Sequence, residues 1–304
     1  MKKKIVDPLI EAQLLEELKS NLPPNIIPDL IETQEIVTDD PSCINSVLLR
    51  FLRAEKHVVS KALHRLALHT EWRREHDPMR IPVDEIANQS SQNKVLLQPN
   101  SPVDGRPVII IRVAQHFVTT AKECEDYVIF CLEIASRCCD DSTFHAVAQQ
   151  PLLNGQATTP TTKAEHATKQ TSSNDGKIWA IMDLRGVKFA NCDSHALAAV
   201  FRLLSRHFPE RVHKIFMLDS PFIFDLLYKA VSPFIDPVTR KKISFVYGTD
   251  ALVEDIDASV LPTTYGGRYA EEVLVETVVE RYRRCWHEKN GEEGEGESFH
   301  DAQE

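Results

Sequence analysis

The chain has 304 residues, of which 42% are hydrophobic and 26% are charged, and its formal net charge is −10. This length accommodates one large or two modest globular domains. Seven acidic residues and one lysine from Glu288 onward leave a net charge of only about −4 for the rest, which argues against nucleic-acid binding and against a strong electrostatic attachment to membranes.

Cysteine usage and the first residues indicate where the protein works. Seven cysteines without the spacing of a metal site favour a reducing compartment. The first four residues are basic, but Asp7 and Pro8 interrupt the apolar core that a signal peptide requires. We therefore expect a cytoplasmic protein.

The first part of the chain has the pattern of a small helical module, which we assign to residues 1–80. Helical patterns cover residues 9–20 and 43–76, where leucines recur at the spacing of an apolar stripe among basic residues. Asp39, Asp40 and Ser42 beside Pro41 supply a signal for a helix start.

Residues 81–270 alternate between strand and helix patterns. Strands are predicted at 107–113, 177–184, 213–218 and 243–247, and helices at 122–140 and 193–207. This alternation predicts an α/β fold with parallel strand pairs. Cys124, Cys131 and Cys138 recur every seven residues, so we expect them on one buried helix face.

Two further segments lack the pattern of a packed core. Residues 146–176 are rich in Gln, Thr, Ser and Ala, and they cannot bury enough apolar surface to offset their ordering entropy. We predict a disordered insertion there. Residues 271–304 are predicted to form a C-terminal helix followed by a disordered acidic tail.

A strongly apolar segment lies between the last two predicted strands. Asp225 and Lys229, together with Pro221 and Pro233, leave far fewer than the ~20 apolar residues of a membrane span. The apolar positions run nearly all round the helix, which suits a helix with a cavity on one side and lipid on the other. On these residues alone, ordinary core packing is the stronger interpretation.

Short motifs follow one another along residues 40–270. They are LLRFLRA (48–54), DGRPV (104–108), IMDLRG (181–186), FPER (208–211), DSPF (219–222), PFIDPVT (233–239) and LPTTYGG (261–267). With these motifs the chain resembles the CRAL-TRIO family, and in particular its fungal-type phosphatidylinositol-transfer proteins. The resemblance implies a mixed, mostly parallel sheet that floors a lipid cavity, a gate helix over it, and a helical N-terminal module.

The resemblance also implies residues for both parts of a lipid. The headgroup residues are Glu210, Arg211, Thr239, Lys242 and Lys56, and the gate and cavity residues are Phe222, Phe224, Leu227, Tyr228, Val231, Phe234, Ile178 and Ala180. Basic side chains supply charge-assisted hydrogen bonds to phosphate. The competing interpretation of Arg211 is an intramolecular pair with a carboxylate, and that of Lys242 is a solvated surface charge.

This sequence departs from the family pattern at three positions. Glu55 stands where the inositol-lipid binders have a basic residue, and its charge repels phosphate unless Lys56 or Arg53 neutralises it. Ile178 and Ala180 stand where members that exchange phosphatidylcholine have small hydroxyl residues. A choline lipid is therefore disfavoured.

The function that the resemblance implies is lipid binding, with transfer between membranes or presentation of the lipid, for example to a lipid kinase. Phosphatidylinositol is the leading ligand, membrane contact is expected to be transient, and other protein partners are left open. The alternatives are a carrier of a tocopherol- or retinoid-like ligand, and a protein-interaction module with a vestigial cavity.

Catalytic and metal-dependent functions find no support in the motifs. The sequence has no G-x-S-x-G elbow and no Walker loop. His57, His64 and His69 do not share one helical face, and we expect them to be exposed. We therefore expect no enzyme activity, no metal site and no cofactor.

Overall fold

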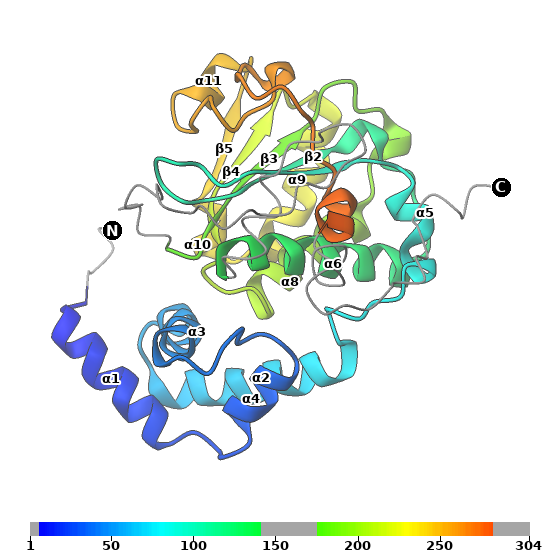
Figure 1. The fold of residues 1–304 in the computed structure, drawn as a ribbon. Helices are drawn as coiled ribbons and strands as arrows, with labels where there is room; N and C mark the ends of the chain where they lie inside the picture. Colours follow the sequence, from blue (N-terminus) through cyan, green and yellow to red (C-terminus); the bar gives the residue numbers. More distant parts are fainter. Residues whose placement is uncertain (1–5, 141–174, 282–304) are drawn as a thin grey trace.

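The computed structural model describes residues 6–140 and 175–281, which form a helical module beside an α/β domain (Figure 1). Apart from Asp175 and Gly176, the predicted insertion at 146–176 lies outside the described residues. So do residues 282–304 of the predicted tail. The described part of the C-terminal segment contains a helix that begins at residue 275.

The helical module is built on capped helices. Within residues 6–76 the helices are α1 (Pro8–Ser20), α2 (Ile26–Glu32), α3 (Pro41–Ala54) and α4 (Val59–His76). Asp40 caps α3 by accepting a hydrogen bond from the backbone N–H of Ser42, and Pro41 occupies the first helical position. The apolar faces of the helices meet in a core that belongs to the module itself.

The helical pattern predicted over residues 43–76 corresponds to two helices. It is divided between α3 and α4 by a turn in which Lys56 and His57 adopt left-handed backbone conformations, with φ of 54° and 64°. A leucine stripe continues across this turn, so apolar periodicity alone did not reveal it. Helix α2 was not predicted, because only seven residues form it.

The described strands form one five-stranded sheet in the order β1-β2-β3-β4-β5. The strands are β1 (Val95–Gln98), β2 (Val108–Arg112), β3 (Ile178–Asp183), β4 (Val212–Leu218) and β5 (Ile243–Val246). Strand β1 pairs antiparallel with β2, and all other neighbours are parallel. The predicted mixed, mostly parallel α/β sheet is therefore confirmed, although the four-residue strand β1 was missed.

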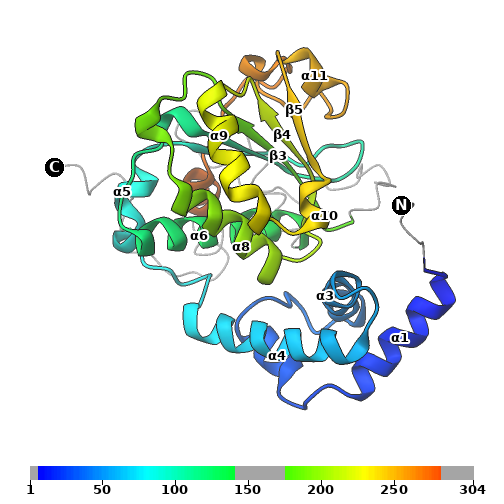
Figure 2. The ribbon, with the colours of Figure 1, turned by 180° about the vertical axis from the view of Figure 1, so that it is seen from behind.

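The two faces of the sheet pack against different parts of the chain, because successive side chains of a strand point to opposite faces. Ile109, Ala180 and Ile215 share one core with α6 (Ala121–Asp140), α8 (Ser194–Arg206) and α9 (Phe222–Val231), all on the same side of the sheet in Figure 2. Ile110 and Phe216 face the other way, toward the chain that follows α11 (Asp250–Val253).

Short elements complete the α/β domain. They are α5 (Ala87–Ser90), α10 (Pro237–Arg240) and the 3-10 helices η1 (Asp84–Ile86), η2 (Val113–Gln115), η3 (Phe189–Asn191), η4 (Ser232–Phe234) and η5 (Thr263–Tyr265).

A buried junction joins the module to the α/β domain. Trp72 of α4 stacks on His207 with ring centroids 3.9 Å apart, and Arg73 pairs with Glu133 of α6. His69 is buried against this junction, so the expectation that it is exposed was wrong. A polar side chain at this position is tolerated because it lies beside Glu35 and the ring of His207.

Gly267, in the last of the sequence motifs, lies against the backbone of Leu261. A Cβ atom at this position would lie 1.9 Å from the Leu261 carbonyl oxygen. We expect Gly267→Ala to lower the free energy of unfolding by about 2–3 kcal/mol in urea denaturation, because the backbone must shift to relieve the overlap. Gly248→Ala is the control: its Cβ would meet no atom within 4 Å, so only backbone strain of about 1 kcal/mol remains. Equal losses would contradict the steric explanation.

Candidate functional site

An apolar cavity lies between the sheet and the helices that cover it. Its volume is about 120 Å³. The lining side chains come from β1 and β2, from Met182 of β3, and from α6, α8 and α9, and they include Val95, Ile109, Ile111, Cys124, Tyr127, Cys131, Leu197 and Val200. The sheet therefore forms the floor of the cavity, as the family resemblance implied.

The cysteine repeat on α6 is buried, as predicted. Cys124, Cys131 and Cys138 are all buried, and the first two line the cavity. Burial raises the pKa of the Cys131 thiol well above its usual value. These cysteines therefore act as small apolar wall residues rather than as reactive thiolates.

Helix α9 lies between β4 and β5 in the chain, where the apolar segment was expected to form the gate helix. Phe224 and Leu227 line the cavity, whereas Phe222 and Leu226 are 74% and 51% exposed. Tyr228 packs edge-on against Phe245 of the edge strand β5, with ring centroids 5.2 Å apart.

Three of the other residues predicted for the gate and cavity, Val231, Ile178 and Ala180, do not line the empty space. Val231 is buried in the core beneath the end of α9. Ile178 and Ala180 face the cavity side of β3, but they are packed into the core, and Met182 lines the cavity instead. The side chain of Phe234 lies outside the described part of the structure.

A second pocket, of about 360 Å³, lies between the two domains and is much more polar. Lys56, Glu210, Thr239 and Lys242 all line it, although they come from three separate segments of the chain. The tertiary structure thus brings together four of the five predicted headgroup residues. Helix α8 contributes to both sites, because Leu197 lines the apolar cavity and Leu204 lines this polar pocket.

The fifth predicted headgroup residue, Arg211, lies elsewhere. It is buried, and its guanidinium donates to both carboxylate oxygens of Asp140, with Nη1 at 2.8 Å from Oδ1. Nη1 also donates to the carbonyl oxygen of Gly176 at 3.2 Å. Burial alone would lower the pKa of Arg211, but the Asp140 carboxylate outweighs it and raises the pKa. The structure thus places Arg211 in the intramolecular pair that was its competing interpretation.

Glu55 is neutralised by an arginine that sequence reasoning did not consider. Arg65 of α4 donates from Nη1 to Glu55 Oε1 at 2.9 Å. Arg53 instead pairs with Glu11, and this hydrogen bond is the main reason that the pKa of Glu11 falls to about 2. The expected repulsion between Glu55 and a phosphate is therefore relieved by Arg65, not by Lys56 or Arg53.

Positive charge remains available in the polar pocket. Lys242 Nζ donates to the Val212 carbonyl oxygen at 2.7 Å and lies 3.9 Å from Glu210. Lys56 and Lys61 are exposed, and within residues 6–140 and 175–281 neither makes an ion pair. These two ammonium groups suit an anionic group entering from solvent.

Comparison with known proteins decides the family. Residues 92–267 match the family model of the CRAL/TRIO domain. The chain belongs to the CRAL-TRIO family. Its Sec14-like relatives place this CRAL-TRIO chain with the fungal-type members, as the motifs suggested.

Curated relatives of this CRAL-TRIO chain are identical to it at about a quarter of the aligned positions. They include the CRAL-TRIO domain-containing protein YKL091C of Saccharomyces cerevisiae, which is 26% identical over 73% of this chain and 70% of its own length. The SEC14 cytosolic factor of Yarrowia lipolytica is 25% identical over 88% of this chain and 49% of its own length. The phosphatidylinositol transfer protein CSR1 of Eremothecium gossypii is 23% identical over 74% and 47%. The matches thus span about half of the latter two proteins.

The crystal structure of Sfh5 has the same fold as this CRAL-TRIO chain. The two superpose with a TM-score of 0.64 over 95% of this chain and 100% of Sfh5, at 18% identity. The predicted CRAL-TRIO fold is confirmed by this superposition. In the described residues no helix is both long and apolar enough to cross a bilayer, and no three His, Cys, Asp or Glu side chains gather as metal ligands would.

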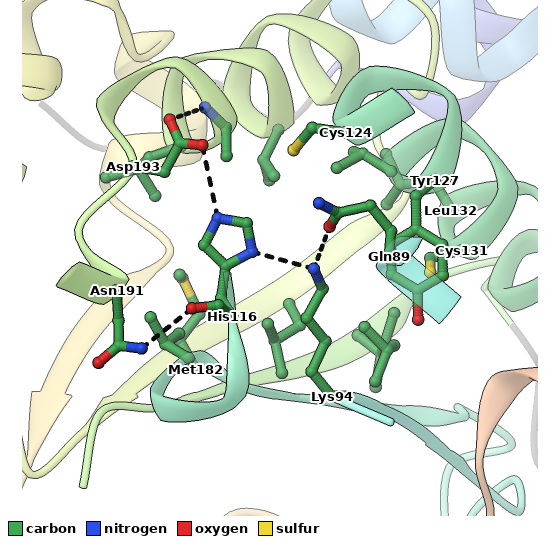
Figure 3. Close-up of a pocket in the computed structure, with 18 of the residues that line it drawn as sticks. Gln89, Lys94, His116, Cys124, Tyr127, Cys131, Leu132, Met182, Asn191 and Asp193 are labelled. Carbon is green, nitrogen blue, oxygen red and sulfur yellow. Dashed lines mark hydrogen bonds and ion pairs between the residues drawn. The ribbon is translucent and has the colours of Figure 1, made fainter. Parts of the chain in front are cut away.

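Sequence reasoning missed a polar cluster in the wall of the apolar cavity. Gln89, Lys94, His116 and Asp193 all line the cavity among its apolar walls (Figure 3). A lysine just before a short apolar strand is not a distinctive pattern, so nothing in the sequence singled out Lys94.

Proposed function

We propose that this protein binds a phospholipid, with phosphatidylinositol preferred, and exchanges it between membranes or presents it to another protein without catalysing a reaction. The observation that carries the proposal is the gathering of Lys56, Glu210, Thr239 and Lys242 in one polar pocket. Because α8 lines this pocket and the apolar cavity, one lipid would reach both sites.

The size of the cavity implies that α9 moves when a lipid enters. A cavity of roughly 150 Å³ holds one benzene ring, and the cavity here is about 120 Å³. Two acyl chains therefore need additional space, and displacement of Phe224 and Leu227 with α9 would supply it. The exposed Phe222 and Leu226 would enter the bilayer at the same time.

The energetics favour exchange at a membrane over release into water. Burial of roughly 30 lipid methylenes is worth about 24 kcal/mol at about 0.8 kcal/mol each. A bilayer offers the same apolar environment, so exchange is nearly balanced there, and the opening of the gate determines its rate.

The names of relatives support the same assignment. A SEC14 cytosolic factor and a phosphatidylinositol transfer protein are among them, and we propose that this protein is also cytosolic and contacts membranes transiently. The presence of a cavity that its own side chains leave open weighs against an interaction module with a vestigial cavity.

Mass spectrometry of retained lipids tests the proposed ligand. The recombinant protein is incubated with a cell-lipid extract and repurified, and its bound lipids are quantified. We expect stoichiometric phosphatidylinositol. A tocopherol- or retinoid-like molecule in its place would reassign the ligand, and the absence of any lipid would overturn the proposal.

Replacement of Lys56 and Lys61 by alanine tests the headgroup pocket. We expect the double variant to transfer phosphatidylinositol between vesicles about five- to thirtyfold more slowly, because each exposed ammonium contributes about 0.5–1 kcal/mol to phosphate binding. Lys242→Ala would test it less cleanly, because Lys242 also bonds to the backbone of β4.

Lys241→Ala is the matched control for the double variant. Lys241 is exposed and adjoins Lys242, but it does not line the pocket. Its replacement should leave transfer unchanged. Equal slowing by both variants would indicate a general effect of charge and would count against a defined headgroup site.

A further inference from the structure

Lys94 is a buried cation in the wall of the apolar cavity. It directly precedes β1, is 5% exposed, and lines the cavity with Gln89 and His116 (Figure 3). The Lys94 ammonium lies 5.1 Å from the centre of the Tyr127 ring. A charged group at such a position is costly unless an opposite charge compensates it.

The hydrogen-bond partners of Lys94 are neutral. Its Nζ donates to Gln92 Oε1 at 2.8 Å, to His116 Nδ1 at 3.0 Å and to Gln89 Oε1. Burial, followed by the charge of Lys94, lowers the pKa of His116, which favours the neutral imidazole that accepts this bond. Among residues 6–140 and 175–281 no carboxylate lies within ion-pair distance of Lys94.

Asp193 and Glu276, whose charges act on Lys94, are bonded to other partners. Asp193 Oδ2 lies 3.4 Å from His116 Nε2, on the far side of the imidazole from Lys94, and Asp193 Oδ1 caps α8 by accepting from His195 and Ala196. Glu276 accepts from the Tyr127 hydroxyl at 2.8 Å, and burial raises its pKa. Burial likewise lowers the pKa of Lys94 to about 8.

We propose that Lys94 binds the carboxylate of a long-chain carboxylic acid whose hydrocarbon chain occupies the apolar cavity beneath α9. The carboxylate supplies the missing counterion, and the apolar walls suit an alkyl chain. This inference rests on the proposed function only in that the cavity admits a lipid chain. As with a phospholipid, a chain of this length requires α9 to shift.

One N–H donor of the Lys94 ammonium can turn away from the cluster without leaving a buried acceptor unpaired. Gln92 Oε1 also accepts from the backbone N–H of Phe117 at 3.0 Å. It therefore stays bonded when the ammonium turns from Gln92 toward a carboxylate. The bonds from Lys94 to Gln89 and His116 can persist and hold the ammonium in place.

Binding of palmitate, 1-hexadecanol and methyl palmitate to the lipid-free full chain tests the proposal. We expect palmitate to bind the wild type at least about tenfold more tightly than the other two, because a charge-assisted hydrogen bond is worth about 1.5–3 kcal/mol. Lys94→Met should abolish this preference by weakening palmitate binding far more than hexadecanol binding. Lys241→Met, at an exposed lysine that lines neither the cavity nor the polar pocket, should preserve it.

Two results would overturn the proposal. One is equal binding of the three compounds by the wild type, which needs no variant and remains informative if Lys94→Met fails to fold. The other is an undiminished preference in Lys94→Met. Transfer of phosphatidylinositol is measured on the same preparations: if it persists while palmitate is not preferred, this inference fails alone, and if no lipid binds, the proposed function fails with it.

Discussion

Replacement of Arg73 by methionine is expected to lower the free energy of unfolding by about 3–5 kcal/mol. The Arg73 side chain is fully buried, and its guanidinium forms two bonds of 3.0 Å to the two carboxylate oxygens of Glu133. It also donates to Glu35 at 2.7 Å and to the Thr33 carbonyl oxygen at 2.6 Å. Methionine fills much of the volume but leaves two buried carboxylates without this donor.

The charges in this junction are strongly interdependent. Burial alone would raise the pKa of Glu35, but Arg73 and Arg50 outweigh it and hold the pKa well below its usual value. Removal of Arg73 therefore leaves the buried Glu35 carboxylate with less compensating positive charge, which destabilises the folded state. Because Glu133 belongs to α6 and Arg73 to α4, the module and the α/β domain should separate more readily in this variant.

The measurement is urea denaturation followed by circular dichroism and tryptophan fluorescence, since Trp72 lies at the same junction. Arg80→Met is the matched control, because Arg80 and Asp77 pair at the surface, with side chains 76% and 39% exposed, where such a pair is worth about 0–1 kcal/mol. Similar losses in the two variants would show that the buried junction contributes no more than a surface pair.

Replacement of Phe222 by aspartate and Leu226 by glutamate is expected to slow lipid exchange between vesicles by at least about a hundredfold. Insertion of the two apolar side chains into a bilayer is worth about 1.5–3 kcal/mol each. Both side chains are already largely exposed, so little folding energy is lost. Aspartate at the first position of α9 is moreover favourable for the helix dipole.

Three measurements separate gating from misfolding and from loss of the ligand. Stopped-flow transfer of a fluorescent phosphatidylinositol gives the rate, mass spectrometry gives the lipid retained, and thermal unfolding gives the stability. Only the rate should change. Leu9→Asp in α1 is the control, because Leu9 is 75% exposed, as Phe222 is at 74%, but lies in the N-terminal module. An unchanged rate in the double variant would exclude α9 as the membrane-contacting gate.

Much of the fold could be predicted because its signals are local. The strands β2 to β5 and the helices α6 and α8 end within one residue of the bounds expected from apolar runs and capping residues. The bounds of α9 follow from the family motifs on either side of it. Helix α2 was missed because its seven residues carry too little periodicity to be distinguished from a turn. Strand β1 was also missed, although β5, of the same length, was predicted.

The candidate site was predicted in part. Lys56, Glu210, Thr239 and Lys242 could be named from motifs, since a motif carries its residues to fixed places in the fold. Arg211 belongs to the same motif as Glu210, but Glu210 lies in the turn before β4 with a left-handed backbone (φ 58°), so the two side chains do not point the same way. One therefore faces the polar pocket and the other pairs with Asp140.

The fold class, the family and the segment that forms α9 could be predicted from the residues alone, because these depend on periodicity and on residues that are close in the chain. The partners of charged groups emerge only in the folded chain: Arg65 with Glu55, Asp140 with Arg211, and neutral acceptors around Lys94. A charge acquires its energy from the groups within a few ångströms and from its burial, and both are set by segments that are distant in sequence.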